Sequence, residues 1–122
     1  MSTAYSDLLV WRKAMDLVCH VYSCTRSFPK EELYGLSSQM RRSAVSVPSN
    51  IAEGKGRFSR KELVQFLFHA RGSLMELETQ ILIADRLGYI DSKTTGVLCS
   101  ECTEIARMLN GLVLRFQPAE RW

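Results

Sequence analysis

Positively charged side chains are concentrated between residues 41 and 61, and no other stretch of the sequence is better suited to bind a ligand. Six cations fall in this stretch: Arg41, Arg42, Lys55, Arg57, Arg60 and Lys61. Glu53 is the one acidic residue among them. Phosphate groups are bound by clustered, accessible cations, preferably near free backbone amides at the start of a helix. The glycine-containing segment 54–59, followed by a predicted helix, offers both, so these six residues are the predicted nucleic-acid-binding residues.

Phe58 lies within this basic segment, and two roles are open to it. The ring could stack on a base, or it could staple the following helix to the core. The segment does not have the GxxxxGK[ST] spacing of a nucleotide-binding loop, and it follows a predicted helix rather than a strand. A solvated basic edge with no partner is the alternative, because a charge patch permits an anionic partner without requiring one.

The cysteines and histidines suggest a second kind of site. Cys99 and Cys102 form a CxxC pair, while His20 and Cys24 lie one helical turn apart near the other end of the sequence. Four such ligands on neighbouring helices could hold zinc. Cys102 falls in an apolar stripe, however, and free cysteine usually behaves as a small buried apolar residue. We predict no metal site, no cofactor and no disulfide.

Catalytic signatures are missing from the sequence. The sequence contains no Glu-x-x-His pair of the kind that holds a di-iron centre in a helical bundle. It also lacks a nucleophile elbow and a recognisable pair of acid–base residues. We therefore predict that the protein is not an enzyme.

Apolar residues recur at spacings of three and four in four segments, each of which predicts an amphipathic helix. These segments are residues 7–26, 32–53, 60–87 and 92–117. Ser59 and Glu62 form a capping box that starts the third helix, and Gly88 ends it. Pro48 lies inside the second helix, where it predicts a kink, and Gly54 is its predicted C-terminal cap. Gly72 and Ser73, in the middle of the third helix, predict a close helix contact there.

Short connections between the four segments predict that consecutive helices run antiparallel. The expected fold is an all-α, antiparallel up-down-up-down four-helix bundle, formed by one domain over residues 1–122. A short arm (1–6) and a tail (118–122) flank the helices. The composition is 46% apolar and 24% charged, and no apolar run approaches the ~20 residues of a membrane span. A soluble, cytoplasmic protein without a membrane partner is therefore expected.

Several motifs, in this order and spacing, resemble one known family. They are Leu-Val-Trp-Arg-Lys-Ala (9–14), Ser-Val-Pro-Ser-Asn-Ile-Ala-Glu-Gly (46–54), Gly-Ser-Leu-Met-Glu-Leu-Glu-Thr (72–79) and Leu-Gly-Tyr-Ile (87–90). The chain resembles the four-helix bundle proteins encoded in intervening sequences of bacterial 23S ribosomal RNA genes. That resemblance implies a homo-oligomeric bundle, with ring-shaped pentamers known. The similar accessory protein of diversity-generating retroelements is also a pentamer with a basic, nucleic-acid-binding surface. No enzymatic activity is established for the family at large.

Surplus apolar surface on the predicted first and third helices also indicates self-association, since Trp11, Phe66, Phe68 and Leu82 extend beyond one stripe. We expect a cyclic homo-oligomer, a pentamer, that serves as an accessory protein binding RNA or DNA. A homo-oligomeric scaffold that recruits a protein partner and no nucleic acid is the alternative. A small-molecule binder is a third interpretation. RNA or DNA binding that weakens steeply with salt would favour the accessory nucleic-acid-binding protein.

Overall fold

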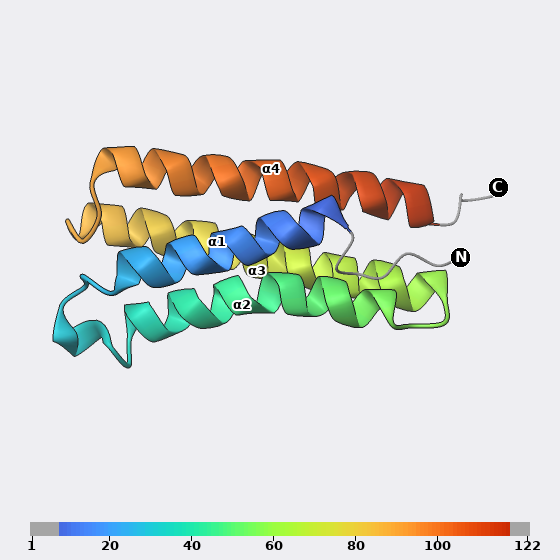
Figure 1. Cartoon of the computed structure of the whole chain (residues 1–122), viewed down its shortest axis with the longest axis horizontal. Helices are drawn as coiled ribbons and strands as arrows, with labels where there is room; N and C mark the ends of the chain where they lie inside the picture. The colour runs from blue at the N-terminus through green and yellow to red at the C-terminus, as the bar shows by residue number, and fades with distance from the viewer. Residues whose placement is uncertain (1–7, 118–122) are drawn as a thin grey trace.

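The computed structural model describes residues 8–117 and consists of four long helices joined by short connections (Figure 1). The elements are α1 (Leu9–Thr25), the 3₁₀ turn η2 (Lys30–Glu32), α2 (Leu36–Lys55), α3 (Arg60–Arg86) and α4 (Ser92–Phe116). No strand occurs in this described range. The predicted all-α four-helix bundle is confirmed, while the arm 1–6 and the tail 118–122 lie outside the described residues.

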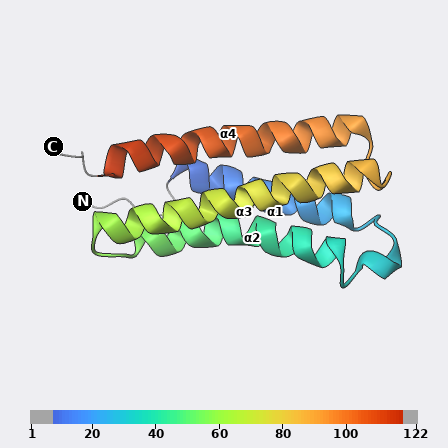
Figure 2. The ribbon, with the colours of Figure 1, turned by 180° about the vertical axis from the view of Figure 1, so that it is seen from behind.

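The four helices pack side by side, and consecutive helices run in opposite directions (Figures 1 and 2). Helix α1 contacts α2 and α4, and α3 contacts the same two helices, so α1 and α3 lie diagonally across the bundle. One end of the bundle, here called the 56–59 end, carries the start of α1, the α2–α3 loop and the end of α4 (Figure 1). The other, the 26–35 end, carries the α1–α2 connection and the α3–α4 turn.

The apolar stripes predicted from the sequence form a single core. The largest side chains with almost no solvent exposure come from all four helices and include Leu17, Met40, Leu74, Ile81 and Leu109. Small side chains bring α2 close to α3, where the Ser46 and Ser73 hydroxyl oxygens lie 2.7 Å apart in a hydrogen bond. None of the described helices is both long and apolar enough to cross a membrane.

The helix ends follow their local sequence signals in most places. Ser59 caps α3 by accepting a hydrogen bond from the Glu62 backbone N–H at 3.1 Å, as the capping box predicted. The Glu62 carboxylate also reaches back, but it accepts from the Ser59 hydroxyl at 3.2 Å and not from the Ser59 backbone N–H. Asp91 caps α4 by accepting from the Thr94 N–H at 2.7 Å. Helix α3 ends at Arg86, and Gly88 follows with a positive φ of 78°, the left-handed conformation by which glycine stops a helix, as predicted.

Two glycine predictions are wrong, and packing explains both. Gly54 does not cap α2, because the helix continues to Lys55 and Gly54 lies buried inside it. A Cβ at residue 54 would come within 2.9 Å of Phe66 Cβ and 3.1 Å of Leu63 Cδ1, so the position has room only for glycine. The residue therefore allows close approach of α2 and α3. Gly72 makes no close contact with another described helix, since a Cβ at that position would meet no described atom within 4 Å. For Ser73 the predicted close contact is confirmed by its hydrogen bond to Ser46.

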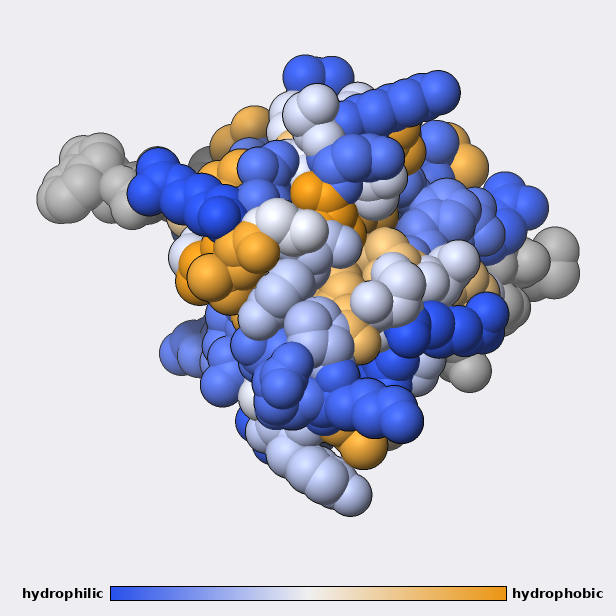
Figure 3. Space-filling model, turned by 90° about the vertical axis from the view of Figure 1, so that its left-hand side faces the viewer, coloured by the Kyte–Doolittle hydropathy of each residue, from blue (hydrophilic) through white to orange (hydrophobic). Residues whose placement is uncertain are grey.

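The second helix begins at Leu36 rather than at residue 32, because Glu32 belongs to the 3₁₀ turn and serves as a cap from outside the helix. Its carboxylate accepts one hydrogen bond from the Leu36 N–H at 3.0 Å and another from the Tyr89 hydroxyl at 2.8 Å. The Tyr89 ring also lies 5.2 Å from that of Phe28. These contacts join the α1–α2 connection to the α3–α4 turn at the 26–35 end, whose surface is mostly hydrophilic with separate hydrophobic patches (Figure 3).

The hydrogen bonds to Glu32 predict how acid affects stability. The Leu36 N–H first, and then the Tyr89 hydroxyl, lower the pKa of Glu32 below its ordinary value of 4.5. A carboxyl group with a lowered pKa in the folded state stabilises the protein above pH 4.5, and that stabilisation is lost as the pH falls through the lowered pKa. In urea unfolding, the wild type should therefore have a higher free energy of unfolding than Glu32→Gln at neutral pH, and this difference should disappear below about pH 4.5. Asp91, whose pKa is also lowered by its capping bonds, contributes equally to both proteins. A stability difference that stays constant from about pH 7 to pH 3 would contradict this account.

Candidate nucleic-acid interface

The α2–α3 loop is a short, well-bonded turn at the 56–59 end. The Gly56 N–H donates to the Glu53 carbonyl at 3.2 Å, and the Arg57 N–H donates to the Gly54 carbonyl at 3.1 Å. On the other side, Ser59 caps α3. The backbone on both sides of Phe58 is thus held by hydrogen bonds, so the loop has a defined backbone conformation from which its side chains project.

Arg60 and Lys61 form the first turn of α3, and both side chains are exposed. The ion pairs of the described residues are Lys13–Glu104 and Arg57–Glu53, with His20–Glu101 a third only when the imidazole is protonated, so neither Arg60 nor Lys61 belongs to one. Positive charge is unfavourable at a helix start, where the unpaired N–H groups already carry partial positive charge. These two cations therefore have no stabilising role that the described contacts explain.

Arg57 is held more firmly than its neighbours. Its guanidinium donates to the Glu53 carboxylate at 2.9 Å, one turn back along the chain, and lies 4.7 Å from the centre of the Phe66 ring. Both side chains of the Arg57–Glu53 pair remain partly exposed, so the pair itself adds little stability. The contacts orient the guanidinium at the edge of the loop, where it remains reachable.

Lys55 and Arg115 complete the positive charge of this end. The Lys55 ammonium lies 6.0 Å from the centre of the Phe116 ring, and the Arg115 guanidinium lies 5.4 Å from the same ring. Sequence reasoning missed Arg115, although the bundle topology contained the signal: the fourth helix must end beside the loop that joins the second and third. The 56–59 end thus combines Lys55, Arg57, Arg60, Lys61 and Arg115.

Arg41 and Arg42 lie elsewhere. They precede Lys55 by about 20 Å along α2, given the helical rise per residue. Arg41 donates to the Thr25 hydroxyl at 2.9 Å and lies 4.9 Å from the centre of the Tyr22 ring, so it joins α2 to α1. Arg42 lines a polar hollow between α2 and α3 that also includes Glu76. The structure therefore does not bring these two predicted residues into one surface with the other four.

Phe58 is fully exposed, with a relative residue exposure of 106%. Of the two roles left open by the sequence, the staple is excluded, because the ring is not packed against α3 or the core. The aromatic face is accessible at the apex of the basic loop.

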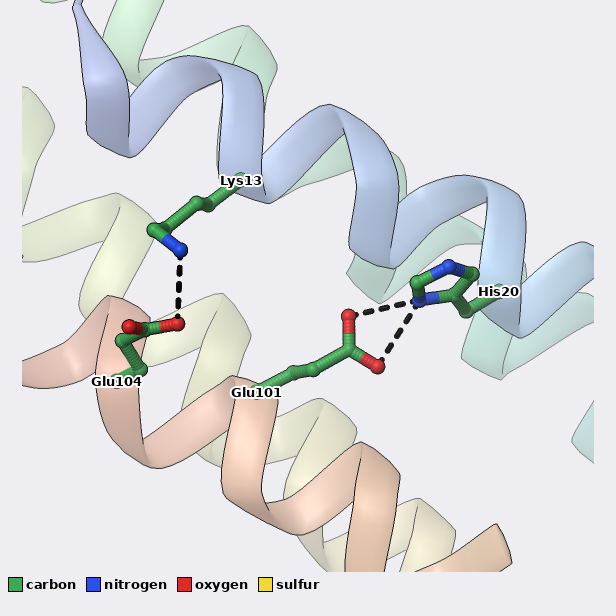
Figure 4. Close-up of polar contacts among 4 residues, drawn as sticks. All are labelled: Lys13, His20, Glu101 and Glu104. Atoms are coloured by element: carbon green, nitrogen blue, oxygen red, sulfur yellow. Dashed lines mark hydrogen bonds and ion pairs between the residues drawn. The ribbon is translucent and has the colours of Figure 1, made fainter.

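The cysteine and histidine residues do not converge on a metal site. Burial raises the pKa of Cys102 to about 12, and burial also raises the pKa values of Cys24 and Cys99, so these thiols stay protonated at neutral pH. Among the described residues, no three His, Cys, Asp or Glu side chains are placed to hold a metal ion. His20 instead lies 2.7 Å from a carboxylate oxygen of Glu101 (Figure 4). Together with the Lys13–Glu104 pair at 3.1 Å, this contact links α1 to α4 (Figure 4).

Comparison with known proteins decides the family. The family model described as 23S rRNA-intervening sequence protein matches residues 6–111. The chain belongs to this family. No curated protein matches the sequence.

A solved structure with the same fold is a protein of unknown function from the S23 ribosomal protein family of Bacteroides thetaiotaomicron VPI-5482. The two chains are 22% identical and superpose with a TM-score of 0.78. The match covers 86% of this chain and 98% of the Bacteroides chain. At this identity the likeness establishes the four-helix bundle fold alone.

Proposed function

We propose that the protein is a non-enzymatic, homo-oligomeric accessory protein of the cytoplasm that binds the phosphate backbone of RNA or DNA. The observation that carries this proposal is the pair of exposed cations Arg60 and Lys61 in the first turn of α3, neither of which forms an ion pair with a residue that the structure describes. A helix start favours acidic residues, so cations there work against helix stability. An anionic partner would reverse that effect, because phosphate oxygens can contact both the side chains and the free N–H groups of the first turn.

The surrounding charges support the same partner. Lys55, Arg57 and Arg115 add three cations from three different helices or loops to the same end. Glu53 and Glu62 are the acids of the segment 53–62, and both are engaged: Glu53 with Arg57, and Glu62 with the Ser59 hydroxyl at 3.2 Å. The loop therefore offers net positive charge to a backbone that passes across the end of the bundle.

The salt dependence of binding tests this function. Fluorescence anisotropy with labelled structured RNA and duplex DNA should show binding that weakens steeply between about 50 and 200 mM salt, because each neutralised phosphate releases counterions. A slope that corresponds to three or more phosphates per subunit is expected. Absence of binding to either probe at the lower salt would contradict the proposal and favour the protein-scaffold alternative.

Exposed apolar surfaces support self-association. A groove of about 310 Å³ between α1 and α2 has no charged residue in its lining, which is Trp11, Met15, Val18, Val45, Pro48, Ser49 and Ala52. On α3, Phe68, Met75 and Leu82 are 38%, 63% and 48% exposed and follow one another at intervals of seven residues. Seven-residue spacing produces a straight seam suited to a partner helix. Two different apolar surfaces on diagonal helices suit a head-to-tail contact, which forms rings when the rotation closes.

The proposed ring predicts a measurable mass. Light scattering at micromolar concentration should give about 70 kDa, the mass of five copies of the 13.9 kDa chain, with the number five taken from the family resemblance. Met75→Glu, which places a charge in the exposed α3 seam, should shift the mass toward the monomer. Ser100→Glu, on an exposed position of α4, is the matched control and should leave the mass unchanged. A monomeric wild type would refute the proposed assembly.

A further inference from the structure

Phe58 is the apex of the basic loop, and its ring makes no contact with the described residues 8–117 that accounts for its position. Isolated exposed apolar residues are common on protein surfaces, so exposure alone does not indicate a ligand. Phe58 differs because hydrogen bonds fix the backbone on both sides of it. The Arg57 N–H is bonded to Gly54, and Ser59 forms the cap of α3. A ring held in this way loses little conformational freedom on binding.

The charges around Phe58 favour a nucleic acid over an apolar protein pocket. Arg57 directly precedes it, and Arg60 and Lys61 follow within three residues. The Arg57 guanidinium lies over Phe66, so it does not cover the Phe58 ring. An aromatic ring flanked by backbone-binding cations is the combination by which proteins bind single strands, where bases stack on the ring while cations follow the phosphates.

We infer that Phe58 stacks on an unpaired base, so that the preferred ligand of the 56–59 end is single-stranded nucleic acid. This inference rests on the proposed function and makes it more specific. In a duplex both faces of each internal base are covered by its neighbours, so a ring can contact a base face only after two base pairs have been unstacked, which costs free energy. In a single strand or a loop a base can turn outward and present its face.

Tyr34 provides a matched control for this role. It is an exposed aromatic residue as well, at 92%, but it lies at the 26–35 end beside Glu31 and Glu32. Its sequence neighbours 31 and 32 are acidic, whereas Phe58 is flanked by cations, and the two residues are almost equally exposed.

The experiment measures the affinity of the full chain for a labelled single-stranded RNA and for the matching duplex, both at about 50 mM salt. Phe58→Ala should weaken single-strand binding by about 5- to 150-fold, the effect of losing one stacked base. Binding to the duplex should change by about twofold or less, because the phosphate contacts remain. Phe58→Trp should retain single-strand binding, and Tyr34→Ala should behave as the wild type. The mass of each variant is measured by light scattering in the same samples.

Three other results would contradict the stacking of Phe58 on a base. Equal losses on single strand and duplex, or no loss on either, would overturn the stacking inference and leave phosphate binding intact. Loss of the assembled mass in Phe58→Ala would also overturn it, by assigning the ring to a subunit contact. Absence of wild-type binding to both probes would overturn the proposed function together with the inference.

Discussion

Replacing Arg57, Arg60 and Lys61 together with alanine should weaken the binding of structured RNA by at least about tenfold at 50 mM salt. Three phosphate contacts would be lost, so the slope of log K against log salt should decrease in magnitude by about 2 to 3. The reason is local: Arg60 and Lys61 have no partner among the described residues, and Arg57 lies at the edge of the same loop.

The matched control for this triple variant removes the same charge from the opposite end. Arg26, Lys30 and Lys93 are exposed at or near the 26–35 end, and their replacement by alanine should change the affinity by about twofold or less, because screening limits the reach of surface charges. Equal weakening by the two triple variants would mean that overall charge, rather than the 56–59 end, drives binding. The Arg57/Arg60/Lys61 variant should be about as stable as the wild type. Removing two cations from a helix start is favourable, and losing one exposed ion pair costs little stability.

Gly54→Val should lower the free energy of unfolding by about 1–3 kcal/mol, the usual cost of overfilling a packed contact. Even a single added carbon would lie 2.9 Å from Phe66 Cβ, an atom attached directly to the α3 backbone. A flexible side-chain tip could move aside, but here α2 and α3 would have to separate. Because the α2–α3 loop joins these helices at the 56–59 end, the separation would also distort the candidate interface.

Gly96→Ala is the contrasting control. Gly96 lies on the exposed side of α4, where an added Cβ meets no atom within 4 Å. Alanine is favoured over glycine inside a helix, so this variant should gain about 0.5–1 kcal/mol. Urea unfolding of both variants checks the signs. A Gly54→Val protein as stable as the wild type would show that α2 and α3 are not packed as closely as described.

The sequence predicted the helices well because their signals are local. Apolar spacing, the Ser59 capping box and the Gly88 stop each depend on residues within one or two turns. The misassigned glycines show where such reasoning ends. Gly54 and Gly72 look alike in a helical pattern, yet only contacts between helices distinguish the glycine that α3 packs against from the one that faces outward.

The candidate site was predicted in part. The four cations of residues 55–61 are adjacent in the sequence, so their proximity needed no fold. Arg41 and Arg42 were grouped with them by charge alone, whereas helical geometry places them about 20 Å away. Arg115 was missed because it is distant in the sequence and only the topology brings it beside Lys55. The choice between two roles for Phe58 required knowing whether its ring is packed.

Amide hydrogen exchange of the full chain, with and without a structured RNA, shows directly whether the 56–59 end binds nucleic acid. We expect slower exchange on RNA binding in peptides that cover residues 55–63 and the end of α4, with residues 26–35 unchanged. Protection confined to another surface, or RNA binding without any protection at 55–63, would contradict it.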